Sequence, residues 1–451
     1  MSVTDAPTDR IPLTAAQEFL RMFDAGPTDG PFGPLYHVVG AWQVEGSLDL
    51  DLLRRALYDV VARHEALRTV VVRDQDPPHQ SIQPPTQPRL TVRELSPAGD
   101  RQRQIEELLN EVEAEGNDVN ELPLVQAVLG RFGEHDSVLM LNAHHTAADA
   151  WAMDRIAGDI GACYRDRSAG KTPELPETLQ YQDYARWEGE HLASPAADKA
   201  RAYWRRTLDG AGVTTLPTDL PRSSGIPKET AWHRFRIDAD LVAATTELAS
   251  KTKSSPFMVL FTAHQLLLRK LTGVTDVVTP TFTPGRGHSR FRDTVGSFVN
   301  FMPLRTDLRD CVTVGDAIAL TRRVCVEAYS HDIPFMHLMA EAPQLMVPAM
   351  DEHRQVGAFQ ALRSPHMMKA VEVGDLKFTK LWRRELSQPV GSDVPDGILW
   401  TLHLGPGTDA VGSLGFNTNR FTADTMSDLL ADYLTVLRKV VTNPDATLGS
   451  L

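Results

Sequence analysis

The chain has 451 residues, of which 42% are hydrophobic and 23% charged, and its formal net charge is −13. This length buries a large core and indicates two or three domains. The acidic balance argues against a nucleic-acid binder, because such proteins need basic surface to neutralise phosphates. The N-terminus is acidic and polar, unlike a signal peptide. A membrane helix needs about 18 consecutive apolar residues, and no run in the sequence approaches that length.

The three cysteines, Cys163, Cys311 and Cys325, lie far apart and match no zinc-binding spacing. Reduced thiols are therefore expected, and with them a cytoplasmic location.

The first half of the chain alternates predicted helices and strands. Ser47 is the predicted N-cap of a helix whose apolar side chains recur every three or four residues. Short apolar runs predict strands, and the Pro- and Gln-rich stretch 81–95 predicts a loop with one short strand. The predicted helices are 52–61, 102–115 and 151–164, and the predicted strands are 69–72 and 138–141.

A charged stretch with Gly and Pro, 166–178, is the predicted boundary between an N-terminal lobe, 1–175, and a C-terminal lobe, 176–451. The second lobe repeats the alternation. Its predicted helices are 238–251, 257–271, 313–330 and 422–441, and its predicted strands are 232–237, 274–281, 297–304, 399–403 and 414–418. Alternation in both halves favours a layered α/β fold.

The run 143–151, with the sequence AHHTAADAW, carries the most specific chemistry. It places His144 and His145 in the loop between a predicted strand and a predicted helix, shortly before Asp149. A rigid scaffold can present a catalytic base on such a loop. Because histidine titrates near neutral pH, one imidazole can take and return a proton there.

Two other interpretations of the histidine pair are simpler. A loop histidine is often only solvated or packed. A metal site is disfavoured, because adjacent side chains in extended backbone point to opposite faces and the helical HExxH spacing is absent. No metal is therefore expected.

Residues 144–150 resemble the HHxxxDG signature of condensation domains from nonribosomal peptide synthesis, and other segments of that family follow in order along the chain. They are 13–17 (LTAAQ), 63–69 (RHEALRT), 181–187 (YQDYARW), 203–204 (YW), 216–222 (LPTDLPR), 255–257 (SPF), 295–305 (VGSFVNFMPLR), 331–335 (HDIPF) and 412–419 (GSLGFNTN). Each segment alone is weak, but their order over nearly the whole chain is specific.

Two departures from the family stand out. Ala150 replaces the glycine that follows the aspartate. Because glycine is favoured where the backbone has a positive φ or closely approaches a ligand, alanine is expected to introduce strain or narrow the site. The second departure is 344–363, where only 359–365 faintly echoes the family string, so local substrate contacts are less certain than the fold.

The resemblance implies an architecture and a partner. It implies two lobes, each like chloramphenicol acetyltransferase, that form a V-shaped pseudo-dimer with a central tunnel closed by a crossover strand of the second lobe. An acyl thioester on the phosphopantetheine arm of a separate carrier protein would enter one side. The acceptor, a small amine or alcohol or a second carrier protein, would enter the other. No cofactor would be bound directly.

The resemblance also implies residue roles. His145 would be the base or positioning group beside the nucleophile, and His144 would be structural. Asp149 would hold the loop by pairing with an arginine of the RHExLRT segment, by position Arg63, and Arg68 would be a helix-end or loop-fixing residue. Candidates for the oxyanion site or the tunnel lining are Ala150, Trp151, Gly296 and Asn300, although Asn300, Trp187 and Trp204 are more often core or loop-fixing residues.

The expected activity is transfer of an aminoacyl or acyl group to an amine or hydroxyl, by a monomeric condensation enzyme. A free-standing protein is expected, and an excised domain is the open alternative. No adenylation signature or carrier attachment site is found in the sequence. Three alternatives remain open: a polyketide-type acyltransferase of the same superfamily, an epimerisation domain, and a catalytically degenerate platform that binds carrier proteins. Ala150 is the feature that favours the platform.

Overall fold

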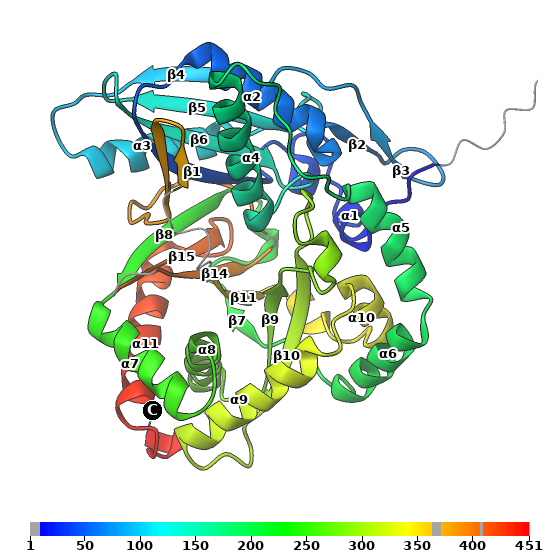
Figure 1. Ribbon diagram of the computed structural model, residues 1–451. Coiled ribbons are helices and arrows are strands. Elements are labelled where there is room, and N and C mark those ends of the chain that lie inside the picture. The colour runs from blue at the N-terminus through cyan, green and yellow to red at the C-terminus, as the bar shows by residue number, and fades with distance from the viewer. Residues whose placement is uncertain (1–9, 363–370, 395, 406–408, 451) are drawn as a thin grey trace, which may run out of the picture. The chain divides into compact units, whose positions relative to one another are not determined.

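The computed structural model describes residues 10–362, 371–394, 396–405 and 409–450, and it contains two compact units (Figure 1). Unit 1 comprises Met1–Ala196, Pro284–Val299 and Lys369–Leu381. Unit 2 comprises Ala197–Thr283, Asn300–Met368 and Trp382–Leu451. The sequence-based division after residue 175 differs from these units, because unit 1 also includes 176–196 and two later segments. Tertiary contacts that the local pattern does not encode hold these segments in unit 1.

Unit 1 is built on a sheet with six described strands in the order β12-β13-β1-β6-β5-β4. Neighbouring strands are antiparallel except β4 and β5, which are parallel. The strands are β1 His37–Glu45, β4 Leu90–Glu94, β5 Val125–Arg131, β6 Asp136–His144, β12 Val371–Val373 and β13 Leu376–Leu381. β6 confirms the strand predicted ahead of the histidines, and its pairing with β1 ends at His37 opposite His144.

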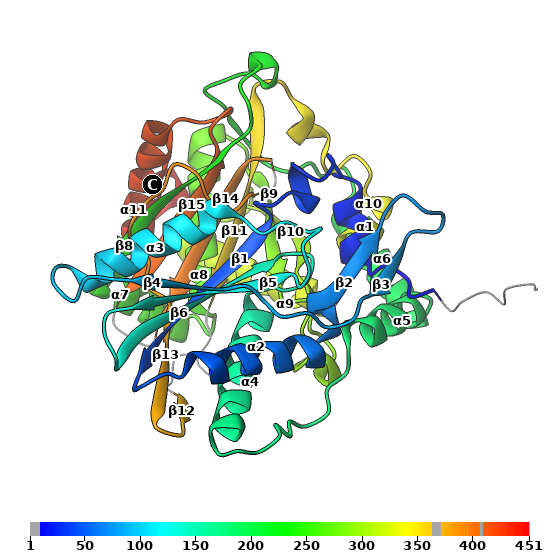
Figure 2. The same ribbon diagram turned by 90° about the horizontal axis from the view of Figure 1, so that it is seen from above.

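Helices cover both faces of this sheet because its central strands alternate apolar side chains between them. On β6, Leu139 and Leu141 face the core shared with α2 Leu50–Arg63 and α4 Ala150–Ser168, which lie side by side in Figure 1. Val138 and Met140 face α3 Arg101–Glu115, which lies on the opposite side of the strands in Figure 2. All three helices confirm predicted ones.

The predicted cap of α2 is wrong by two residues. Asp49, not Ser47, is the N-cap, and its carboxylate accepts hydrogen bonds from the backbone N–H groups of Asp51 and Leu52. A carboxylate is favoured there by the helix dipole as well as by the orphan N–H groups.

The remaining described elements of unit 1 are short or lie beside the sheet. They are α1 Ala15–Arg21, η1 Gly30–Phe32, η2 Glu65–Arg68, the hairpin of β2 Thr69–Val72 and β3 His79–Ile82, α5 Tyr181–Leu192, and η4 Ser289–Phe291.

Unit 2 contains a second sheet, in the order β7-β11-β14-β15-β8, and a separate antiparallel pair, β9 and β10. Its strands are β7 Thr215–Pro217, β8 Thr230–Ile237, β9 Asp276–Thr283, β10 Asn300–Asp307, β11 Arg354–Leu362, β14 Ile398–Leu404 and β15 Ala410–Asn417. Its helices are α6 Pro195–Thr207, η3 Arg222–Ser224, α7 Ala239–Lys251, α8 Pro256–Thr272, α9 Val314–Tyr329, α10 Phe335–Glu341, η5 Val347–Met350, α11 Ala423–Thr442 and η6 Leu448–Ser450.

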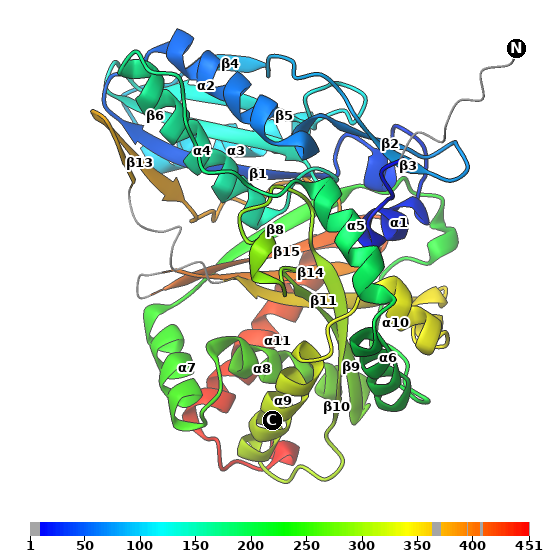
Figure 3. The ribbon, with the colours of Figure 1, turned by 45° about the vertical axis from the view of Figure 1, so that its right-hand side comes forward.

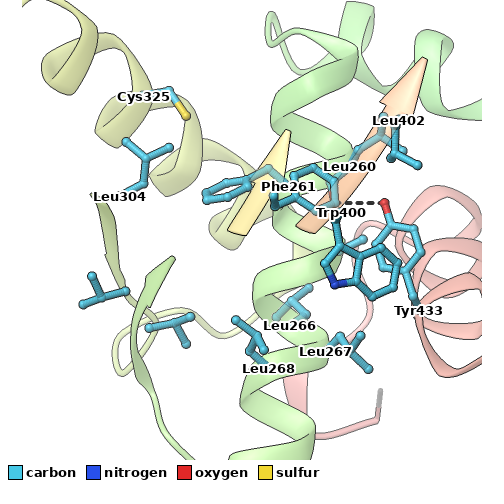
Figure 4. Close-up of a cluster of buried hydrophobic side chains, with 14 of the residues drawn as sticks. Leu260, Phe261, Leu266, Leu267, Leu268, Leu304, Cys325, Trp400, Leu402 and Tyr433 are labelled. Atoms are coloured by element: carbon cyan, nitrogen blue, oxygen red, sulfur yellow. Dashed lines mark hydrogen bonds between the residues drawn. The ribbon is translucent and has the colours of Figure 1, made fainter. Parts of the chain in front are cut away.

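The core of unit 2 surrounds α8, which has ten consecutive buried residues, Val259 to Leu268. Figure 3 shows α7, α8 and α11 gathered on one face of the strands. In Figure 4, Phe261, Trp400 and Tyr433 come from α8, β14 and α11, and the Tyr433 hydroxyl donates to the Leu260 carbonyl oxygen at 3.3 Å.

The predicted strand 297–304 is only partly correct. β10 begins at Asn300, while residues 297–299 belong to the segment of unit 1 that joins β9 to β10. Of the family echo at 359–365, residues 359–362 lie in β11 and 363–365 lie outside the described residues. The other predicted elements of unit 2 are confirmed within a few residues at each end.

Candidate active site

The two histidines lie at the end of β6. His144 is the last residue of the strand and not a loop residue as predicted, while His145 is the first residue of the loop. β6 ends at His144 and α4 begins at Ala150, so 145–149 form a five-residue connection. Thr146, Ala147, Ala148 and Asp149 are buried. The loop is therefore part of the folded core of unit 1 and holds its side chains in fixed positions.

His144 is enclosed and fully hydrogen-bonded. Its Nε2 lies 3.2 Å from the Gly33 carbonyl oxygen, and its Nδ1 lies 2.8 Å from Thr146 Oγ1. A carbonyl can only accept, so Nε2 donates and Nδ1 accepts from the threonine hydroxyl. Burial lowers the pKa of His144 to about 3, so the ring is neutral at pH 7. These contacts fit the structural role expected for it.

His145 is held in a different environment. Its backbone N–H donates to the Tyr36 carbonyl oxygen at 2.8 Å, and its ring stacks on the Tyr36 ring with centroids 5.0 Å apart. Burial lowers the pKa of His145, and the negative charge of Asp149 partly opposes this shift. Neutral imidazole is thus the form present at pH 7, which is the form that can accept a proton.

Asp149 fixes the end of the loop that leads into α4. It is the N-cap of α4, and its Oδ1 accepts the backbone N–H of Ala152 at 2.7 Å. The same carboxylate accepts the backbone N–H of Phe298 at 3.1 Å and two contacts from Arg286 Nη2, at 3.1 and 3.2 Å. The side chains of Asp149 and Arg286 are only 3% and 4% exposed, so this is a buried ion pair.

The predicted partner of Asp149, Arg63, is wrong, because Arg286 occupies that position. Arg286 also donates from Nη1 to the carbonyl oxygens of Phe291 and Thr294, at 3.1 and 2.8 Å. Its guanidinium carbon lies 4.0 Å from the centroid of the Phe298 ring. Arg286 therefore attaches the whole segment Pro284–Val299 to the histidine loop.

Sequence reasoning had no local signal for this pair, because Asp149 and Arg286 are 137 residues apart. The weak clue is composition: 284–287 reads PGRG, a turn that presents one arginine between two glycines. Gly285 has φ +59°, and a β-carbon there would lie 1.8 Å from the Phe298 carbonyl oxygen. Glycine is therefore required for the turn that carries Arg286.

Arg63 instead binds a second carboxylate of α4. Its Nε donates to Asp159 Oδ2 at 3.1 Å, and its Nη2 donates to the Pro176 carbonyl oxygen. His64 Nε2 lies 2.8 Å from the same Asp159 oxygen. Arg63 and His64 of the RHExLRT segment therefore tie α2 to α4 at Asp159, which follows Asp149 by ten residues.

Arg68 makes contacts that fit the helix-end role expected for it. Its guanidinium donates to the carbonyl oxygens of Val61 and Ala62, at 3.3 and 3.4 Å, and to that of Gln83 at 2.6 Å. Since the last carbonyls of α2 have no partner within the helix, Arg68 satisfies two of them.

The strain expected at Ala150 is absent. Ala150 is the first residue of α4 and is exposed, and it is not among the residues with positive φ. Helical backbone suits alanine better than glycine. Trp151, the next residue, is 39% exposed, and its Nε1 donates to the Arg292 carbonyl oxygen at 3.0 Å.

The two remaining candidates have packing and loop-fixing contacts. Gly296 is buried, and a β-carbon there would lie 2.2 Å from a ring carbon of Tyr181, so the glycine is explained by close packing. Asn300, in unit 2, donates from Nδ2 to Asp332 and to the Ile333 carbonyl oxygen, at 2.9 and 2.8 Å. Its Oδ1 accepts the Phe335 N–H at 2.9 Å, which fits the loop-fixing role considered for it.

The two tryptophans expected to be structural also lie in packed surroundings. Trp187, half-buried in unit 1, packs against Tyr184 and Phe291. Trp204, fully buried in unit 2, donates from Nε1 to the His331 carbonyl oxygen at 2.7 Å.

Within the described ranges, no three or more His, Cys, Asp or Glu side chains gather in a way that could hold a metal ion. In the same ranges, no helix is both long and apolar enough to cross a membrane.

Comparisons with known proteins agree on one family. The condensation-domain model matches residues 8–348. The chain is also similar to SgcC5 from Streptomyces globisporus, whose crystal structure contains (R)-(-)-1-(2-naphthyl)-1,2-ethanediol and sucrose. The two are 49% identical, the match covers 97% of this chain and 100% of SgcC5, and the TM-score is 0.93.

Two more distant relatives are a much longer protein and a single domain. CymA from Salinispora arenicola, a probable non-canonical nonribosomal peptide synthetase, is 31% identical over 98% of this chain, which spans 6% of the length of CymA. The X-domain from teicoplanin biosynthesis is 26% identical, with a TM-score of 0.78 and coverage of 99% of this chain and 98% of the X-domain. That X-domain has also been solved in complex with OxyB.

Proposed function

Because the chain belongs to the condensation-domain family of nonribosomal peptide and natural-product biosynthesis, we propose that it is an acyltransferase that uses a carrier protein as donor. The acyl group would arrive as a thioester on the phosphopantetheine arm of the carrier. It would leave as an ester or amide of a second substrate.

The observation that carries this proposal is the state of His145. It is neutral because burial lowers its pKa, and its loop is fixed by Asp149 and Arg286. A degenerate site has no need to keep a neutral imidazole on a loop held by a buried ion pair, since such a pair is costly to desolvate.

His145 has a specific task in the proposed reaction. Its Nδ1 is buried, so in the proposed reaction Nδ1 keeps the ring proton and Nε2 is the acceptor. Nε2 takes the proton of the attacking hydroxyl or amine as the new C–O or C–N bond forms. The proton then goes to the thiolate sulfur as the C–S bond breaks.

Base catalysis accounts for only part of the expected rate. General-base assistance contributes about 10²- to 10⁴-fold, and correct positioning of two large substrates can contribute as much. A variant without the His145 imidazole therefore retains a residual rate if the site mainly positions its substrates.

A hydroxyl is the favoured nucleophile. The structure of SgcC5 contains a vicinal diol, and this chain is 49% identical to SgcC5 over nearly its whole length. A diol in the related protein supports an alcohol acceptor and hence an ester product.

A platform without catalysis is the second candidate, because the X-domain of teicoplanin biosynthesis is known in complex with another protein, OxyB. For this chain, Ala150 is the sequence feature that favours it. Since Ala150 lies in helical backbone, it does not count against activity. A polyketide-type acyltransferase and an epimerisation domain remain as further outcomes of the test.

The test uses an aminoacyl-loaded carrier protein, pooled alcohol and amine acceptors, and intact-protein mass spectrometry. Wild type should unload the carrier only when an acceptor is present, at a rate about 10²-fold or more above that of His145→Ala. Arg68→Lys, whose contacts are with the end of α2 and Gln83, serves as a folding-matched control. Binding of carriers without unloading would favour the platform, and inversion of the carrier-bound residue without transfer would favour epimerisation.

A further inference from the structure

We propose that Tyr36 is a positioning residue for His145, and that its aromatic face sets the orientation of the imidazole and stabilises the imidazolium formed during acyl transfer. This inference rests on the proposed function, because it assigns a task to Tyr36 within that reaction. No motif identified in the sequence pointed to this residue.

The placement of Tyr36 follows from the pairing of two strands. β1 and β6 are antiparallel, and the register ends with His37 opposite His144. One step further, Tyr36 lies opposite His145, and the His145 N–H donates to the Tyr36 carbonyl oxygen at 2.8 Å. Both residues are half-buried.

The two rings then stack. Their centroids are 5.0 Å apart and their planes are inclined by 21°, whereas the Tyr36 ring meets His144 at 6.1 Å and 64°. The near-parallel contact therefore belongs to His145 alone of the two histidines. Parallel stacking restricts rotation of the imidazole about its last torsion, which is otherwise broad.

The backbone around Tyr36 is itself fixed. Its N–H donates to the Gly33 carbonyl oxygen at 3.1 Å, and the same carbonyl group contacts His144 Nε2 at 3.2 Å. The next carbonyl oxygen, of Pro34, accepts the N–H of Asn117 at 2.8 Å. The turn 33–36 thus supports both histidines, and Tyr36 is its contact with the reacting ring.

An aromatic face favours the charged form of a ring stacked on it. The π-face of a phenol ring is negative, so it attracts imidazolium more strongly than imidazole. The other titratable groups around His145 are Asp149 of its own loop, which is paired with Arg286, and the histidines His37 of β1 and His144 of β6. Both of these histidines have pKa values lowered by burial, so they add no negative charge. Asp149 and the backbone at His145 and Ala148 favour the imidazolium, and we assign Tyr36 a further share.

The experiment compares Tyr36→Leu with Tyr36→Phe in the full chain. Leucine keeps an apolar cover over His145 but removes the aromatic face, while phenylalanine keeps the face and removes only the hydroxyl. In carrier unloading, Tyr36→Leu should lower kcat about 10-fold with little change in the acceptor KM, and should shift the pH–rate profile. Tyr36→Phe should stay within about threefold of wild type.

A second measurement does not depend on turnover. In protein labelled on histidine, the His145 ring signal is identified by its loss in His145→Ala, and its titration is followed by NMR. Tyr36→Leu should lower the pKa of His145 by about one unit, and Tyr36→Phe should not.

Three results would overturn the inference. They are an unchanged titration of His145 in Tyr36→Leu, an unchanged kcat in that variant of an active enzyme, or equal losses in Tyr36→Phe and Tyr36→Leu. If wild type transfers no acyl group while the titration shifts as expected, the proposed function fails and the contact between Tyr36 and His145 is upheld.

Discussion

Two carboxylates on α4, ten residues apart, bind their arginines in different ways. Asp149 is the N-cap of the helix and pairs with Arg286. The side chains of Asp149 and Arg286 are only 3% and 4% exposed. Asp159 lies in the middle of the helix and contacts Arg63 and Arg155, whose side chains are 16% and 30% exposed. The first pair holds the histidine loop, and the second ties helix to helix. Both carboxylates are buried, so the position of each in the helix and the exposure of its arginine partners separate the two tasks.

The largest expected loss of stability comes from breaking the buried ion pair of Asp149 and Arg286. Asp149→Asn removes the charge that compensates Arg286 and should destabilise unit 1 by about 3–5 kcal/mol. Urea unfolding at pH 7 with a fluorescence signal measures this change.

The control for this variant is Asp149→Asn combined with Arg286→Met, which removes both charges. The double variant should be more stable than Asp149→Asn alone, because no unpaired charge remains. Additive losses would show that the two residues do not act as a pair.

A pH series compares the surroundings of the two carboxylates. His37, near the histidine loop, has its pKa lowered to about 4 by burial. Burial also lowers the pKa of His64, but the neighbouring Asp159 opposes this shift. Because a lowered folded-state pKa means that the unfolded chain binds more protons, stability should fall as pH decreases from about 6.5 to 4.

His37→Phe should flatten that pH dependence more than His64→Phe does. With the unfolded pKa near 6.5 and the folded value about 4, His37 penalises the native state by about 3 kcal/mol at pH 4. The free energy of unfolding measured at pH 7 and at pH 4.5 tests this. Equal slopes in wild type and His37→Phe would contradict it.

Much of this architecture follows from local pattern. The strand Asp136–His144 and the helix Ala150–Ser168 are encoded by apolar periodicity, so the position of the histidine loop is predictable from the sequence alone. The partner of Asp149 is not, because the pairing of charges 137 residues apart depends on how Pro284–Val299 returns to unit 1. Tyr36 was missed for a similar reason, since its contact arises from strand register.

A third test replaces each arginine by alanine in turn and compares the two variants. Arg63→Ala leaves Asp159 in contact with His64 and Arg155, so the carboxylate keeps partners and the loss should be about 1–2 kcal/mol. Acyl transfer should remain within about threefold of wild type. Arg286→Ala, by contrast, should lower transfer by at least about tenfold, because it releases the loop of His145. Carrier unloading at a temperature where both variants are folded distinguishes them.

The smallest effect is expected at Ala150, the departure from the family motif. Ala150→Gly restores the family glycine next to Asp149, but Ala150 is helical and free of left-handed strain. Glycine in a helix costs about 0.5–1 kcal/mol relative to alanine, so the variant should be slightly less stable. Transfer should change by less than about threefold, because the Asp149–Arg286 pair and the His145 ring are untouched. A transfer rate tenfold or more above that of wild type would instead show that the methyl group of Ala150 obstructs a substrate. The start of α4, and not the ion pair, would then limit the rate of transfer.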